Sequence, residues 1–249
     1  MNAVVLVHGV GLDGHLWDHV AALLSPTRSV ICYDLLGHGD SPPLARGSTV
    51  DTFVEQLAAI APQKVDLVGF SLGALIAQAF ALAHPKRVGR LVLVSTVFDR
   101  TPAERTAIMA RVDEVRAGGY AATVESAIDR WFAPGFQPAE DVENVRTRMN
   151  TNDVESYANA YEIFAAADQT LAARTGDLAI PVLAITGADD PRSTPAMSRS
   201  LAAAVPHGRA VVLPGVRHLV PIEAPTVLAG HILEFLEGPD FDQPTGLRR

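Results

Sequence analysis

The chain has 249 residues, and its 20 basic and 28 acidic side chains give a formal net charge of −8. Hydrophobic residues make up 48% of the sequence and charged residues 19%, the balance of a globular protein with a substantial core. The acidic excess argues against nucleic acid as a partner. No apolar run reaches the roughly 18 residues of a membrane span, and the first residues lack the pattern of a signal peptide. We therefore expect a cytoplasmic protein that makes no membrane contact.

The chain contains one cysteine, Cys32, which excludes an internal disulfide and suits a reducing compartment. It lies in the apolar stretch 30–33, which predicts a buried strand thiol. His15 and His19 lie near acidic residues at a spacing that could be mistaken for a metal site. A solvated helix face explains that spacing more simply, so we expect no metal.

Short aliphatic runs alternate with helical patterns near both ends of the chain. Strands are predicted at residues 3–7, 29–33, 65–69, 91–95, 182–186 and 210–213. Helices are predicted over about 16–25, 50–61, 72–83, 195–204 and 225–236. Uninterrupted apolar strands that alternate with helices indicate an α/β fold, in which a mostly parallel sheet is covered by helices on both faces.

The alternation stops between residues 96 and 179. This stretch predicts consecutive amphipathic helices over 101–117, 121–132, 141–150 and 154–167. Because the chain returns to the same sheet afterwards, we expect residues 98–178 to form a helical lid inserted before the last two strands. Residues 1–97 and 179–237 then form the core, and the polar residues 238–249 a disordered tail. An independent helical domain is the alternative.

The most specific motif is the G-x-S-x-G at residues 69–73, which lies between a predicted strand and a predicted helix. This context is typical of a nucleophile elbow, a strained turn that presents the central serine, Ser71, at a helix N-terminus. The two glycines remove side chains where strand and helix approach each other closely. The motif predicts a serine hydrolase.

A serine nucleophile needs a base to accept its proton and an acid to orient that base. In this architecture the chain order is serine, acid, histidine, each in a loop after a strand. His218 is the one histidine in such a loop downstream of Ser71, and Asp190 is the favoured acid. Its neighbour Asp189 stays open as an alternative, as does Asp99.

The first strand is followed by His8-Gly9-Val10-Gly11. Glycines leave backbone N–H groups facing a cavity, so Val10 N–H and Leu72 N–H are the candidate oxyanion donors. We expect His8 to brace the loop and Asp34 to bind local backbone.

Together these motifs resemble the α/β-hydrolase superfamily: the His-Gly loop, Trp17, the glycine turn that begins at Asp34, the elbow and His218. The resemblance implies a Ser71–Asp190–His218 triad, attack on an acyl carbon, an acyl-enzyme, hydrolysis by water and no cofactor. Within the superfamily the chain is most similar to the 3-oxoadipate enol-lactonase group and to carboxylesterases, which implies a small-molecule ester or (enol-)lactone as substrate.

The segment 129–132 reads Asp-Arg-Trp-Phe and is similar to the cap of the enol-lactonase group. This similarity makes Arg130 and Trp131 the candidate substrate-binding residues, with Arg130 as the partner of a substrate carboxylate. Two alternatives stay open. One is hydrolysis of a carbon–carbon bond in a ring-cleavage product by the same triad, and the other is a non-catalytic ligand receptor on the same fold.

Members of this superfamily usually carry an antiparallel hairpin before the His-Gly strand. Here only seven residues precede His8, so we expect that hairpin to be missing. The strand at 29–33 would then lie at the sheet edge with unpaired backbone groups. We hypothesise that a second subunit of a homodimer, or the polar tail, covers this edge.

Overall fold

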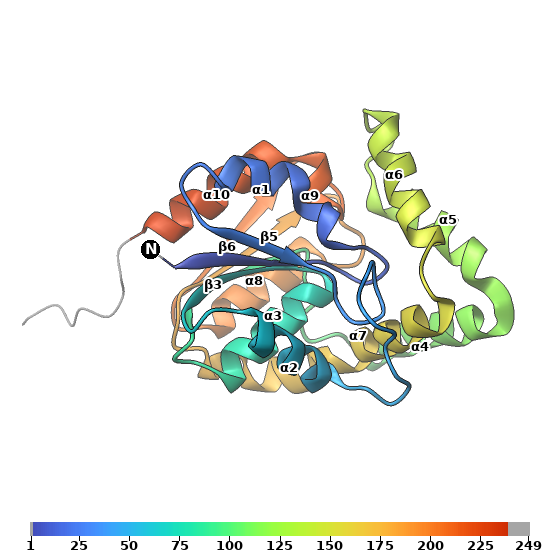
Figure 1. Ribbon diagram of the computed structural model, residues 1–249, viewed down its shortest axis with the longest axis horizontal. Helices are drawn as coiled ribbons and strands as arrows, with labels where there is room; N and C mark the ends of the chain where they lie inside the picture. Colours follow the sequence, from blue (N-terminus) through green and yellow to red (C-terminus); the bar gives the residue numbers. More distant parts are fainter. Residues whose placement is uncertain (1, 239–249) are drawn as a thin grey trace, which may run out of the picture.

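The computed structural model describes residues 2–238, and its centre is one six-stranded sheet (Figure 1). The strands lie in the order β2-β1-β3-β4-β5-β6, and every neighbouring pair is parallel. Their bounds are β1 Ala3–Val7, β2 Val30–Tyr33, β3 Val65–Phe70, β4 Val88–Val94, β5 Val182–Gly187 and β6 Gly208–Leu213. Parallel strands place all their carboxyl ends at the same edge of the sheet, and ligand sites form there.

Helices cover both faces of the sheet (Figure 1). The helices α1 (Asp18–Leu24) and α10 (Pro225–Glu237) lie on one face, and α2 (Val50–Ile60), α3 (Leu72–Ala83) and α8 (Pro195–Ala204) on the other. Two shorter helices, η1 (Gly14–Trp17) and α9 (Val220–Glu223), complete the core. Strand β3 and nearly all of α3 are buried, because this strand and helix are apolar on every side.

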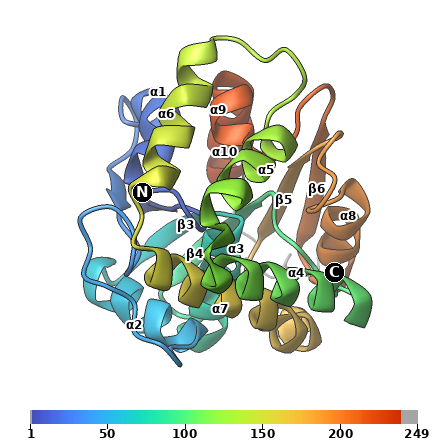
Figure 2. The same cartoon turned by 90° about the vertical axis from the view of Figure 1, so that its right-hand side faces the viewer.

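A helical insertion, residues 95–181, separates β4 from β5 in sequence although the two strands pair in the sheet. It contains α4 (Pro102–Glu114), η2 (Val115–Gly119), α5 (Tyr120–Trp131), α6 (Ala139–Asn150), α7 (Val154–Arg174) and η3 (Thr175–Asp177). Figure 2 looks onto the carboxyl ends of the strands and shows these helices in front of them.

The predicted α/β fold is confirmed, as are the parallel sheet and the helices on both faces. The helices predicted over 72–83 and 195–204 have the predicted bounds. The strand predicted from residue 91 begins at Val88, which pairs with Val65 of β3. Arg90 interrupts the apolar run, and the register with β3 shifts between Val65 and Leu67. No helix within residues 2–238 is long and apolar enough to cross a lipid bilayer.

Strand β2 lies at one edge of the described sheet, as predicted. The prediction that Cys32 is buried was wrong: Cys32 is exposed, because an edge strand of four residues is covered less well than a central strand. Burial of part of the side chain, with Asp18 nearby, still raises the pKa of the Cys32 thiol to about 11. The predicted tail, residues 239–249, lies outside the described residues.

Candidate active site

The turn between β3 and α3 holds Ser71 in a conformation that L-amino acids rarely adopt, with φ 53° and ψ −112°. A Cβ on Gly69 would lie 2.3 Å from Gly73 O, and a Cβ on Gly73 would lie 2.2 Å from Val7 O. Both positions therefore require glycine. Ser71 N–H donates to Val94 O at 2.9 Å, which fixes the turn to β4. The elbow geometry expected from the motif is thus present.

His218 and Asp190 form a buried hydrogen-bonded pair. The distance from His218 Nδ1 to Asp190 Oδ2 is 2.7 Å, and the exposed fractions of the two residues are 6% and 3%. The other carboxylate oxygen of Asp190 accepts hydrogen bonds from Arg192 N–H and Ser193 N–H at 2.9 and 3.0 Å. A carboxylate held in this way can orient an imidazole and stabilise its charged form.

The two alternative acids lie elsewhere. Asp189 is exposed, one residue before Asp190 on the loop after β5. Asp99, after β4, is also exposed and has φ 50°. Neither forms a hydrogen bond with His218 among the described residues, and this geometry favours Asp190 as the acid.

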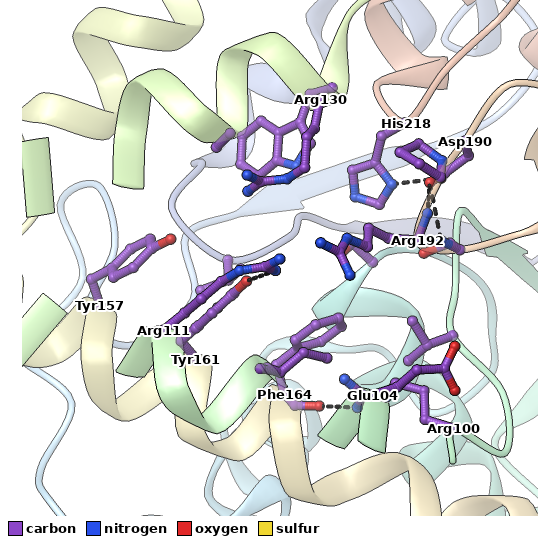
Figure 3. Close-up of a pocket in the computed structure, with 18 residues that line it drawn as sticks. Arg100, Glu104, Arg111, Arg130, Tyr157, Tyr161, Phe164, Asp190, Arg192 and His218 are labelled. Carbon is purple, nitrogen blue, oxygen red and sulfur yellow. Dashed lines mark hydrogen bonds and ion pairs between the residues drawn. The ribbon is translucent and has the colours of Figure 1, made fainter. Parts of the chain in front are cut away.

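Ser71 and His218 line one cavity together with Asp190 (Figure 3). Ser71 is 5% exposed, and no hydrogen bond joins its hydroxyl to His218 within residues 2–238. Such bonds are often long without substrate and shorten in the reacting complex. The arrangement places a serine hydroxyl and an imidazole around the same space.

Val10 and Leu72 lie next to this cavity. Val10 lines it, and Leu72 is the first residue of α3, where the N–H groups have no partner inside the helix. His8 Nε2 accepts a hydrogen bond from Leu35 N–H at 2.8 Å, so His8 braces the loop as expected. Burial, and next the neighbouring His38, lower the pKa of His8 to about 3, which keeps it neutral.

The loop that carries His218 is bonded to the end of α5. His218 N–H donates to Trp131 O at 3.0 Å. The Glu223 carboxylate accepts from Ala133 N–H at 2.9 Å and from Arg217 N–H at 3.0 Å. Burial raises the pKa of Glu223. The insertion and the histidine loop are therefore held together by a shared, half-buried carboxylate, which the sequence did not indicate.

Arg130 and Trp131, the candidate substrate-binding residues, both line the cavity, and the Trp131 ring lies 5.9 Å from the His218 ring between centroids. Seven further polar lining residues were not predicted as site residues: Arg100, Glu104, Arg111, Tyr157, Tyr161, Arg192 and Ser193. The first five lie in the insertion, and their positions depend on how its segments pack, which has no local sequence signal. Arg192 and Ser193 follow Asp190 closely in the sequence, and this short spacing was the available signal.

No group of three or more histidine, cysteine, aspartate or glutamate side chains in the described part of the chain is arranged to hold a metal ion. The chemistry that the described cavity offers is that of a serine, an imidazole and a carboxylate, with arginines nearby.

Comparison with known proteins gives consistent results. A family model described as alpha/beta hydrolase fold matches residues 2–225. The (E)-2-((N-methylformamido)methylene)succinate hydrolase of Acinetobacter baylyi is 32% identical over 226 residues, which cover 89% of this chain and 85% of that protein. The 3-oxoadipate enol-lactonase 2 of the same organism is 29% identical, covering 90% of this chain and 84% of that protein.

A solved structure shows the same arrangement. The crystal structure of the enol-lactonase from Burkholderia xenovorans superposes with a TM-score of 0.86 at 27% sequence identity, covering 96% of this chain and 93% of that one. The likeness therefore includes both the sheet and the insertion.

Proposed function

The chain belongs to the alpha/beta hydrolase fold family, and from this premise we propose that it is a serine hydrolase acting on a carboxylic ester or enol-lactone of a small molecule. The observation that carries the proposal is the buried 2.7 Å hydrogen bond between His218 and Asp190, which faces the same cavity as Ser71. Relatives named as a hydrolase of a substituted succinate and as an enol-lactonase support the choice of substrate.

In the proposed mechanism, Ser71 Oγ attacks the carbonyl carbon while His218 Nε2 takes its proton. Asp190 accepts the hydrogen bond from His218 Nδ1–H and stabilises the imidazolium. The negative oxygen that forms on the substrate lies against Val10 N–H and Leu72 N–H at the N-terminus of α3. His218 then protonates the leaving oxygen, and the acyl group remains on Ser71.

The second half of the reaction uses the same groups. His218 removes a proton from water, which attacks the acyl carbon, and then donates that proton to Ser71 Oγ as the bond to the acyl group breaks and the acid is released. The helices of the insertion supply much of the cavity wall, including Arg130 and Trp131, so we assign substrate contact to these two residues. In this proposal residues 98–178 serve as the lid, which excludes water from the first step.

Replacement of Ser71 by alanine tests the proposal. Ser71→Ala should abolish hydrolysis of a short activated ester, because no other group supplies the nucleophile, and it should abolish labelling by a fluorophosphonate probe. Ser193→Ala is the matched control, since Ser193 lines the same cavity and its hydroxyl forms no hydrogen bond among the described residues. The Ser193→Ala protein should still be labelled. Labelling or turnover in a folded Ser71→Ala protein would refute the assignment.

A further inference from the structure

The cavity is unusually rich in arginine. Three arginines reach it from three elements: Arg111 from α4, Arg130 from α5 and Arg192 from the loop after β5. Figure 3 shows their side chains directed into the cavity that Ser71 and His218 share. Arg111 and Arg130 are half-buried, and Arg192 is exposed.

None of these three arginines forms an ion pair with a carboxylate within residues 2–238. Arg111 donates to the Tyr161 hydroxyl at 3.4 Å, and Arg130 donates to the Ser126 hydroxyl. Elsewhere in the insertion the fold does pair arginines: Arg100 lies 2.7 Å from Asp168, and Arg116 lies 2.7 Å from Glu162.

The carboxylates of the cavity are already engaged. Four arginines and two carboxylates line it, and the carboxylates are Glu104 and Asp190. Glu104 accepts hydrogen bonds from the N–H and the hydroxyl of Thr101 at the start of α4. Asp190 is bonded to His218. With Arg100 matched by Asp168, the other three arginines have no bonded anion in the part of the chain that the structure describes.

Without a bound anion, the closeness of these three arginines raises the free energy of the folded protein. Burial lowers the pKa of Arg130, and the nearby positive charges of Arg111 and Arg192 lower it further. Like charges held together in a partly desolvated space repel, and a carboxylate between two guanidinium groups replaces that repulsion with charge-assisted hydrogen bonds. Arginine presents a planar fork that matches a carboxylate.

We propose that the substrate is a dicarboxylate, with one carboxylate between Arg111 and Arg130 and the other on Arg192 at the exposed side of the cavity. This inference rests on the proposed function, because it places the scissile ester or lactone carbonyl beside Ser71 between the two anchors. Two anchors follow because the two oxygens of one carboxylate can be shared by Arg111 and Arg130, which leaves Arg192, on a third element, for a second carboxylate.

A series of methyl esters with one carbon skeleton tests the charge requirement. The trimethyl ester, the 1,2-dimethyl ester and the 2-monomethyl ester of propane-1,2,3-tricarboxylic acid each keep the central ester and carry zero, one and two terminal carboxylates. Binding is measured by calorimetry on Ser71→Ala, which holds the ester without turnover. We expect each added carboxylate to tighten binding at least about tenfold at low salt, with smaller gaps at high salt.

Arginine variants on the Ser71→Ala background separate the two anchors. Arg192→Gln should remove the advantage of the dianion over the monoanion. Arg130→Gln should remove the advantage of the monoanion over the neutral ester, and so should Arg111→Gln. The matched control is Arg146→Gln on α6, because Arg146 is paired with Glu125 and lines no part of this cavity. It should leave all three affinities unchanged.

Equal affinity for the three esters would overturn the inference, as would an arginine variant that weakens the neutral ester as much as the dianion. If an arginine variant does not fold, the affinities of the three esters for the Ser71→Ala protein still test whether carboxylates tighten binding. The proposed function fails separately. If the three esters bind in the expected order but the fluorophosphonate probe does not label the protein, the proposed hydrolase activity is refuted and the dicarboxylate preference stands. If the probe labels the protein but the neutral ester is turned over fastest, the dicarboxylate preference is refuted and the hydrolase activity stands.

Discussion

At the scale of single residues, two neighbouring aspartates have the same side chain and different surroundings. Asp190 is buried and bonded to His218, whereas Asp189 is exposed. A residue of this kind acts by fixing the imidazole tautomer, which an amide of the same shape cannot do. The sequence placed both aspartates in the correct loop. It could not distinguish them, because one position along a loop decides which side chain turns inward.

Asp190→Asn should lower kcat by about 10³–10⁴-fold with the fold intact, because the amide would favour the wrong tautomer of His218. Asp189→Asn is the matched control and should retain wild-type kcat. Steady-state kinetics on an activated ester provide the measurement. A similar loss in both variants, or in neither, would contradict the assignment of Asp190.

The glycines of the elbow allow a test of close packing. Gly73→Ala should destabilise the protein by at least about 3 kcal/mol and abolish activity, because its Cβ would overlap the backbone oxygen of Val7. Gly230→Ala on α10 meets no atom within 4 Å and should stabilise the helix by about 0.5–1 kcal/mol. Urea unfolding of both variants measures whether the free energy of unfolding falls in Gly73→Ala and rises in Gly230→Ala. A Gly73→Ala protein that folds and turns over substrate normally would contradict the close packing at this turn.

At the scale of elements, the core strands and helices could be predicted closely, because periodicity and caps are local signals. The helix over 72–83 is apolar except for Gln78, and a His-Pro pair follows it. The insertion was harder to predict. Helix α7 continues to Arg174, beyond the predicted end at residue 167, since no glycine or proline interrupts that stretch.

The cavity wall could be predicted only in part. Arg130 and Trp131 were predicted because their segment is similar to the cap of the enol-lactonase group. Arg111 lies in a stretch for which the sequence predicted only an amphipathic helix. Which face of α4 points toward Ser71 depends on packing against α7, a long-range contact with no sequence signature. The exposure of Cys32 could not be predicted for a similar reason. A short apolar run predicts a strand but does not indicate whether that strand lies at the edge or in the centre of the sheet.

Glu223 joins the insertion to the loop of His218, the base in the proposed mechanism. Glu223→Gln replaces one carboxylate oxygen with an NH2 group, which cannot accept one of the two hydrogen bonds from backbone N–H groups. We expect the free energy of unfolding to fall by about 1–3 kcal/mol. We expect a lower kcat with little change in KM at temperatures well below unfolding, because the His218 loop loosens. Glu234→Gln, which breaks an exposed ion pair with Arg209, is the control. An unchanged kcat in Glu223→Gln would exclude this positioning role.

At the scale of the whole molecule, two buried histidines link stability to pH. Burial lowers the pKa of His8 to about 3 and of His38 to about 4, from an ordinary value of 6.5. Between pH 6.5 and about 4 the unfolded chain binds protons that the folded chain does not. Stability contributed by these groups is therefore complete above pH 6.5 and is lost as the pH falls toward the folded pKa values.

We expect the free energy of unfolding to fall by up to about 1.4 kcal/mol per pH unit for each of these histidines below pH 6.5. Urea unfolding at pH 7, 6 and 5 measures the slope. His38→Gln should reduce it, whereas replacement of the exposed His15 by glutamine should leave it as in the wild type. An identical slope in His38→Gln would show that other groups govern acid unfolding.

The pairing of β4 with β5 has a consequence for how this protein can change over evolutionary time. The two strands are neighbours in the sheet although residues 95–181 separate them in sequence. The entropy of closing a chain excursion grows only with the logarithm of its length, so insertions or deletions there leave the register of the sheet almost unaffected. Ser71, Asp190, His218 and the proposed anchor Arg192 follow strand ends, whereas Arg111 and Arg130 come from the excursion. Under the proposed function, the contacts that the excursion makes with a substrate can therefore diversify while the reacting groups stay in place.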